Sequence, residues 1–407
     1  MDQPISSLIA ALAYSPEDRL FFLDPGALGF GYICSPLTGG DDRIANRLNN
    51  IMNLAWPAET IVQFCLWAGP DLRPEQVKLP VPEDLPPLLQ QSRDSRVEFL
   101  REKSVAPLDG SGLRLRQVQL VVTARLPLVY GEPTDADQKR ALELRDAALE
   151  SLKASGLQAR VMTVEDYLRV METLLNWSAA ASWRQTDAAV FDANRLIRDQ
   201  IADYETAVVV HRDRLELGGK VVKVLSPKRL PESSYFGVAH QFLMDPVAGA
   251  RGIRENVLIS AAVYFPDTEA KRGKLEKERQ WVANQAYGPL LKYVPRLAKK
   301  KQSYDVLFEA LDRGDRLVRV ALSVVLFCDP GEESAAVANC QAFWRESGFQ
   351  LLEDRFITLP MFLNSLPLGA EPEAVAQLNR YRTMGSRQAL LFLPVFGSWQ
   401  GTATPGV

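Results

Sequence analysis

The sequence has few of the residues that build metal centres and nucleophilic active sites. Its 407 residues include only two histidines and four cysteines. His211 follows a Val-Val-Val run and His240 falls in an expected helix, and neither has a cysteine or carboxylate at the spacing of a metal-ligand set. No GxSxG motif occurs, so the sequence offers no nucleophile elbow. We therefore predict no metal ion and no catalytic residue in this chain.

Closely spaced cysteines are also missing, because no two are near enough to form a CxxC pair. Cys34, Cys65 and Cys328 lie in apolar runs typical of strands, where cysteine usually acts as a small buried hydrophobic residue. We expect these three, and Cys340, to be reduced core residues of a cytoplasmic protein rather than members of a disulfide framework.

A membrane span, a secretion signal and a basic excess are absent too. No stretch reaches the roughly 18 consecutive apolar residues that a membrane-spanning helix needs, and Asp2 and Pro4 stand where a signal peptide would carry basic residues. The 47 Lys and Arg residues are outnumbered by 50 Asp and Glu residues, which argues against nucleic acid as the main ligand. We expect a cytoplasmic protein that contacts the membrane only peripherally or through a partner.

The sequence contains no phosphate-binding loop. Such a loop reads GxxxxGK[ST], because its backbone amides and lysine wrap the phosphates of a nucleotide. The nearest string is Gly218-Gly219-Lys220-Val221, which has Arg214 in place of the first glycine and lacks the final Ser or Thr. It also stands between two runs typical of strands. We interpret it as a hairpin turn and predict no ATP or magnesium site in this chain.

Two halves of the chain contain the same order of expected elements. The order is strand, helix, strand, helical insert, strand, helix, strand. Gly112 and Gly314 each precede the third strand of a half, and Ser155-Gly156 and Ser347-Gly348 each end the last helix. This order is typical of ferredoxin-like units. Two unrelated α+β domains are the alternative.

We therefore predict an α+β fold of two ferredoxin-like units joined by a helical connector. The apolar spacing at 4–13 predicts a short amphipathic helix, Asp24-Pro25-Gly26 predicts a hairpin turn, and 235–243 is expected to be helical. The predicted segments are an N-terminal helical segment (1–18), a first unit (19–163), the connector (164–203), a second unit (204–360) and a linker (361–407).

Two features are candidate functional elements. Gly29 and Gly31 flank an aromatic residue in an expected strand, and we predict a backbone conformation there that is closed to other residues. Lys299, Lys300 and Lys301 lie in the charged helical insert at 267–313. The insert has two interpretations: a solvated helix face with Glu–Lys pairs, or a contact with anionic lipid headgroups or an acidic partner.

Several stretches resemble the TraC branch of conjugation ATPases, which is related to the wider VirB/TrbE/CagE group of secretion ATPases. The stretch FFLDPGALGFGYICSPLTGGDDRIANRLNNIMN resembles the opening strand, Gly-Phe turn and first helix of that branch. TIVQFCLWAGPDL, which contains Gln63, resembles the following strand. Three further stretches resemble parts of its second half: RLIRDQIADYETAVVVHRDRLELGGKVVKVLSPKRLP, NVLISAAVYFPDTEAKRGKLEKERQ and LDRGDRLVRVALSVVLF. RYRTMGSRQALLFLPVFGSWQGTATPGV resembles the passage that leads into the RecA-like motor.

The resemblance implies the N-terminal, non-catalytic docking and assembly region of such an ATPase, ending before the motor. It implies binding to inner-membrane components of a type IV secretion system that builds a pilus and transfers DNA. It also implies a place at the bacterial inner membrane and self-association, with ATP and Mg bound by the full-length protein outside this chain. The alternative is a stand-alone cytoplasmic α+β enzyme or adaptor, which a pocket with converging titratable side chains would favour.

Overall fold

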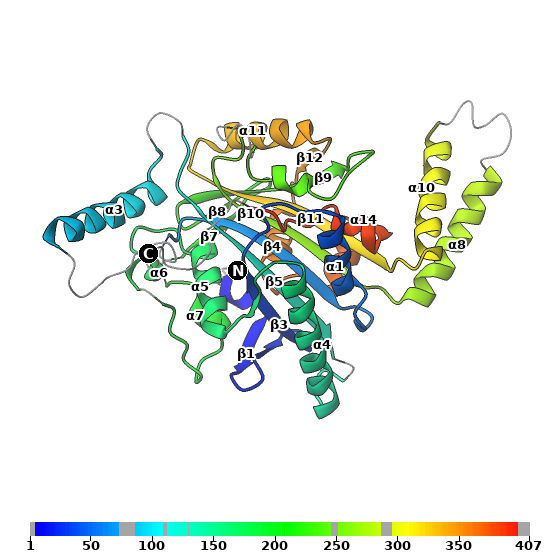
Figure 1. Cartoon of the computed structure of the whole chain (residues 1–407), viewed down its shortest axis with the longest axis horizontal. Coiled ribbons are helices and arrows are strands. Elements are labelled where there is room, and N and C mark those ends of the chain that lie inside the picture. The colour runs from blue at the N-terminus through cyan, green and yellow to red at the C-terminus, as the bar shows by residue number, and fades with distance from the viewer. Residues whose placement is uncertain are drawn as a thin grey trace.

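The core of the protein is one antiparallel sheet, seen in a computed structural model that describes residues 5–72, 86–108, 112–128, 130–186, 188–204, 206–245, 251–285 and 295–397. Ten strands follow the order β1-β2-β3-β5-β4-β10-β11-β9-β8-β7, while β6, β12 and β13 pair with β3, β9 and β11 (Figure 1). The strands are β1 (Ala11–Ser15), β2 (Leu20–Leu23), β3 (Ala27–Cys34), β4 (Ile61–Gly69), β5 (Gln117–Pro127), β6 (Arg160–Val161), β7 (Val208–Val210), β8 (Leu215–Leu217), β9 (Lys220–Arg229), β10 (Asn256–Tyr264), β11 (Leu317–Cys328), β12 (Gln350–Glu353) and β13 (Arg382–Gly385).

Helices cover both faces of this sheet. The helices are η1 (Ile5–Leu8), α1 (Asp42–Met52), α3 (Pro87–Val105), α4 (Asp135–Ala154), α5 (Val164–Leu175), α6 (Ser182–Gln185), α7 (Arg198–Ile201), η2 (Val238–Gln241), α8 (Thr268–Gln285), α10 (Pro295–Asp312), α11 (Glu333–Glu346), α12 (Thr358–Ser365), α13 (Pro372–Gln377) and α14 (Ser386–Leu390). One core lies beneath α1, α4, α11 and α14, and a second core lies beneath η1, α5, α7 and α12. Strands buried on both faces read as continuous apolar runs, and β4 is indeed buried along its whole length.

The two halves of the chain meet at the centre of the sheet. Strand β4 pairs with β10 in antiparallel register from Ile61↔Tyr264 to Ala68↔Val257. On either side of this pair the strand orders are β6-β3-β5-β4 and β12-β9-β11-β10. The repeated order of strands is therefore present, but both halves belong to one sheet. The boundaries at 19–163 and 204–360 remain predictions.

The helical inserts occupy corresponding places in the two halves. Helix α3 connects β4 to β5, and α8 and α10 connect β10 to β11. They extend from opposite ends of the molecule (Figure 1). Helices α8 and α10 pack together, with Arg279 Nη2 3.0 Å from Asp305 Oδ1 and the Tyr304 hydroxyl donating to Glu278 at 2.8 Å. Among the described side chains of α3, only Ser104 is buried.

The N-terminal segment differs from its prediction. Instead of an amphipathic helix over 4–13, the described residues form the short 3-10 helix η1 and then strand β1. β1 pairs with β2, with Tyr14 opposite Phe21. Strand pairing to β2 overrides the helical spacing of the apolar residues. The helix expected at 235–243 is likewise only the four-residue turn η2.

The part of the expected linker that the structure describes is folded onto the sheet. Residues 361–397 include most of α12, all of α13 and α14, and strand β13, which pairs with β11. Phe362 and Leu393 are completely buried. An isolated bridge joins Phe396 to Leu37, close to α1. Apolar residues are frequent in this segment, and the fold buries them instead of leaving an extended connection.

Candidate functional site

The polar chemistry of the described residues is sparse. No group of three or more His, Cys, Asp or Glu side chains among them is placed to hold a metal ion. All four cysteines are buried and unpaired with one another, as predicted. Burial raises the pKa of the Cys65 thiol to about 12, so at neutral pH it is no thiolate nucleophile. None of the described helices combines the length and apolarity that crossing a bilayer demands.

The two histidines contact different groups. His211 Nε2 is 2.9 Å from Glu216 Oε1, across the turn between β7 and β8. His240 Nε2 is 3.0 Å from the carbonyl oxygen of Thr38.

The Gly-Gly-Lys string is a hairpin turn, as predicted. Gly218 and Gly219 connect β8 to β9 with φ values of 54° and 88°. Two consecutive positive φ values suit a two-residue hairpin loop and favour glycine at both positions. Lys220 opens β9 instead of a helix.

Gly29 and Gly31 lie in β3, and the reason predicted for them is wrong. Neither has a positive φ, so their backbone is open to other residues. The constraint is packing against neighbouring side chains. A Cβ on Gly31 would lie 2.5 Å from Met162 Cε, and one on Gly29 would lie 2.8 Å from Leu23 Cδ1. Sequence reasoning identified the positions but could not see these neighbours.

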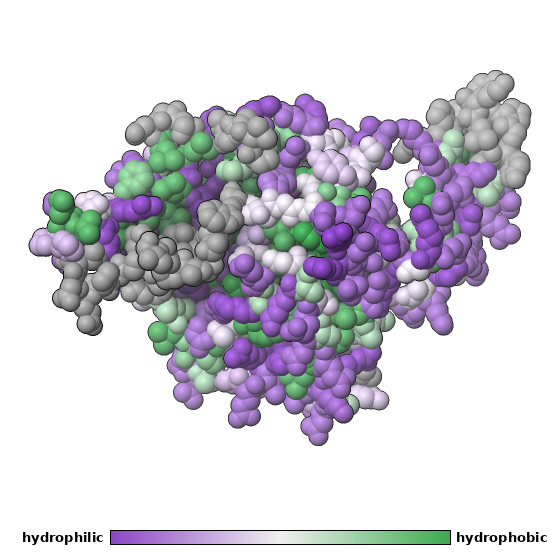
Figure 2. Space-filling model, viewed as in Figure 1, coloured by the Kyte–Doolittle hydropathy of each residue, from purple (hydrophilic) through white to green (hydrophobic). Residues whose placement is uncertain are grey.

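Two of the three lysines of α10 contact other parts of the protein, and their role as a basic patch remains a prediction. Lys299 Nζ lies 3.2 Å from Glu232 Oε1, in an exposed ion pair with the body of the protein. Lys300 Nζ instead lies 6.0 Å from the ring centroid of Trp281 on α8. Trp281 is 56% exposed, and sequence reasoning gave it no role. Polar side chains dominate the visible surface of α8 and α10 (Figure 2).

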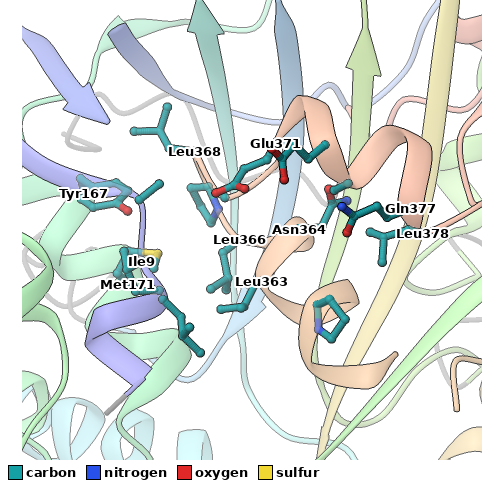
Figure 3. A pocket seen from close by; sticks show the side chains of 17 residues that line it. Ile9, Tyr167, Met171, Leu363, Asn364, Leu366, Leu368, Glu371, Gln377 and Leu378 are labelled. Atoms are coloured by element: carbon teal, nitrogen blue, oxygen red, sulfur yellow. The ribbon is translucent and has the colours of Figure 1, made fainter. Parts of the chain in front are cut away.

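An apolar groove lies between segments that are far apart in sequence. It has a volume of about 170 Å³ and is lined by η1, α5, α12 and α13. Figure 3 shows Ile9, Tyr167 and Met171 on one side and Asn364 and Gln377 on the other. No sequence signal pointed to this groove, because its walls come from the expected N-terminal helix, connector and linker.

The polar groups of the groove are few. Its acidic residues are Glu371 and Glu373. Burial raises the pKa of the Glu371 carboxyl, while the nearby Arg125 guanidinium acts in the opposite direction. Glu371 and Glu373 are the only carboxylates among the described lining residues, which include no histidine, cysteine or lysine. The described lining of the groove therefore suits an apolar side chain.

The profile of a family described as TraC protein matches residues 5–370. No curated protein matches the chain. The matched residues include both halves of the sheet, both inserts and α12.

Proposed function

Because this chain belongs to the TraC protein family, we propose that it is the docking and assembly region of a conjugative type IV secretion ATPase. Family membership assigns the chain to conjugative transfer. The proposed role is to bind inner-membrane components of the secretion complex from the cytoplasmic side. Pilus assembly and DNA transfer would then be the processes that the complex serves.

Each half of the sheet is proposed to be a ferredoxin-like unit. The orders β6-β3-β5-β4 and β12-β9-β11-β10 support this assignment, because each places the fourth strand beside the first and the third between the first and second. All these neighbours are antiparallel. Such units host many functions, so the functional argument depends on surfaces.

The observation that carries the docking role is the exposure of the inserts. Both faces of the sheet are already covered by helices, whereas α3 and the α8–α10 pair extend away from the two cores. The described side chains of α3 include exposed Leu88, Leu89 and Phe99. Most of the stability of a helix in a protein comes from packing of its apolar side chains, so a partner that covers these three residues would stabilise α3.

The α8–α10 pair is proposed as the contact with the inner-membrane complex. Its exposed Trp281 beside Lys300 offers an amphipathic anchor and a positive charge. Aromatic residues of this kind often carry much of the binding energy at protein interfaces. The chain is proposed to lie peripherally at the membrane and to self-associate in the assembled ATPase.

The test is removal of this insert without disturbing the sheet. Tyr264 pairs with Arg319, so the strand ends lie close enough for a short Gly-Ser loop to replace 268–312. We expect the variant to keep its circular dichroism spectrum and to lose co-purification with the inner-membrane components of the secretion complex. Replacing 268–312 would leave α3 in place, and a separate replacement of 86–108 tests the contribution of α3, so the two proposed surfaces can be distinguished. Undiminished recovery without α8 and α10 would contradict the proposed contact.

ATP hydrolysis is proposed to be the task of a motor domain outside residues 1–407. The Gly218–Lys220 hairpin, which opens a strand and not a helix, supports this view. Purified chain should show no steady-state ATPase activity with Mg present. Turnover that disappears in a Lys220→Gln variant would instead favour the stand-alone enzyme.

A further inference from the structure

Strand β7 lies at one end of the sheet and has an open edge (Figure 1). It pairs with β8 on one side, and no described strand pairs with its other side. His211 N donates to the carbonyl oxygen of Arg214 across the turn that joins β7 to β8, so the backbone groups of His211 and of Val209 face β8. The N–H and C=O groups of Val208 and Val210 therefore face away from the sheet. They form no hydrogen bond on that side with any residue that the structure describes.

The side chains along this edge are apolar and exposed. Val209 is 48% exposed and Val210 is 54% exposed, and Val209 also lines a hollow of about 440 Å³. The strand contains none of the charged residues or prolines that often protect a sheet edge from pairing. At the opposite end of the sheet, the β1 residue Leu12 accepts a hydrogen bond from Ile197 N at 2.9 Å, so that edge is partly covered. Strand β7 thus offers both backbone groups and apolar side chains to another strand.

The residues on either side of β7 carry charges of opposite sign. Asp203 precedes the strand and Arg212 follows it, and neither forms an ion pair with a described residue. Asp213 comes next, but its carboxylate is paired with Lys223, whose Nζ lies 2.8 Å away. When two copies of this strand pair in antiparallel orientation, the acidic start of each lies beside the basic end of the other. Charge complementarity therefore favours a second copy of this chain as the partner.

Contacts with Phe356 hold Arg212 at the end of the strand. Phe356 N donates to the carbonyl oxygen of Arg212 at 2.6 Å, and the Arg212 Cζ lies 4.5 Å from the ring centroid of Phe356. Phe356 has a φ of 67°, which is rare for a bulky side chain, and it is 73% exposed. An unfavourable backbone conformation thus keeps an aromatic ring at the surface, where it supports the cation beside the open edge.

We propose that β7 pairs with β7 of a second copy of the chain across a two-fold axis. Val208 of each copy exchanges two backbone hydrogen bonds with Val210 of the other, so all four open groups of each strand are satisfied. Val209 lies opposite its own counterpart at the axis, in a pair that exchanges no hydrogen bonds. Arg212 lies opposite Thr206 at the start of the other strand.

This pairing is a weak contact on its own. Two three-residue strands bury less surface than a permanent dimer requires, so we expect association that depends on protein concentration. Other contacts within an assembled complex would reinforce it by raising the effective concentration of the strands. The inference assigns a surface to the self-association proposed above and rests on that part of the proposed function, but not on the contact made by α8 and α10.

The first experiment is analytical ultracentrifugation of the full chain over a range of protein concentrations. We expect a reversible equilibrium between monomer and dimer. Val209→Lys would place two lysines opposite each other at the axis and should weaken the dimer about tenfold, with an unchanged circular dichroism spectrum. The control is Val190→Lys, because Val190 is 84% exposed and precedes Phe191, whose ring packs against Tyr14 at the other end of the sheet. It should form dimers like the unaltered chain.

The second experiment is cysteine cross-linking, which tests the register. The four natural cysteines are buried and should stay unreacted. Opposite residues that exchange no hydrogen bonds have Cα atoms about 4.5 Å apart, which a disulfide can bridge, whereas diagonal neighbours are about 7–8 Å apart. Under mild oxidation, Val209→Cys should form a disulfide-linked dimer. Val210→Cys, at a similarly exposed position but diagonal to its counterpart, should do so much more slowly.

The outcomes separate this surface from the rest of the proposed function. Dimers of Val209→Lys as tight as those of the unaltered chain, or equal cross-linking of the two cysteine variants, would overturn the surface and leave self-association intact. A chain that stays monomeric at every concentration would overturn both, whereas the contact of α8 and α10 is judged by co-purification alone. If Val209→Lys loses co-purification with inner-membrane components while its oligomeric state is unchanged, the edge pairs with another protein and the second copy is excluded.

Discussion

At Gly31, strand β3 passes so close to its neighbours that a side chain has no room. Met162 is completely buried, and its Cε would lie 2.5 Å from a new Cβ. We predict that Gly31→Val lowers the free energy of unfolding by about 1–3 kcal/mol through overpacking. Urea unfolding measures this change. Gly39→Val is the control, because no atom lies within 4 Å of its Cβ position, and equal losses in the two variants would contradict the packing argument.

The ionisation of Glu371 makes the stability of the folded protein depend on pH. Burial raises its pKa in the folded state, so the folded protein holds this proton more strongly than the unfolded chain does. Its ionisation therefore costs stability as the pH rises from about 4.3, the ordinary value for glutamate, through the raised pKa of the folded state.

We predict that Glu371→Gln is more stable than the unaltered chain at pH 7, and that this advantage disappears below about pH 4, where the glutamate is protonated in both states. Thermal melts of the two proteins between pH 4 and 7 measure the difference. A variant that is less stable at pH 7 would show that attraction to Arg125 outweighs burial.

At the scale of elements, α12 joins the C-terminal part of the chain to the core. Phe362 is completely buried and its ring centroid lies 6.3 Å from that of Phe327. We predict that Phe362→Ala lowers the free energy of unfolding by about 3–5 kcal/mol, since it leaves a cavity between α12 and β11. Phe99→Ala on exposed α3 should change it by less than about 0.5 kcal/mol. Denaturant titration compares the two, and similar midpoints would mean that α12 adds little to the core.

Sequence reasoning worked best for strands and worst for segments whose partners are distant. β4 and β11 are mostly apolar, and their strand character was evident without a structure. The spacing of Ile5, Leu8 and Ile9 fits an amphipathic helix, but it fits equally well a short turn that packs onto the second core before a strand. Only the pairing of β1 with β2 decides between the helix and the turn. The walls of the groove beside Glu371 come from distant segments of the chain, so no local pattern could reveal it.

The two halves should unfold together. Each of the two large cores contains residues from both halves, such as Phe64 and Val324 in one and Trp67 and Phe327 in the other. Neither half can therefore keep its core when the other is lost. We predict a single transition in which tryptophan fluorescence and circular dichroism coincide during denaturant unfolding. A chain of residues 5–203 alone should lack a cooperative transition, and two separate transitions in the full chain would contradict this coupling.

The antiparallel pairing of β4 with β10 has a mechanical consequence. The insert of the first half leaves the sheet after Gly69, and that of the second half leaves it after Tyr264, which is opposite Ile61. The two attachment points therefore lie at opposite ends of the paired strands. A load that draws the inserts apart pulls β4 and β10 along their lengths in opposite directions, so the hydrogen bonds of the ladder share the force instead of breaking one after another. Partner proteins bound to the two inserts would therefore be kept at a constant separation under such a load.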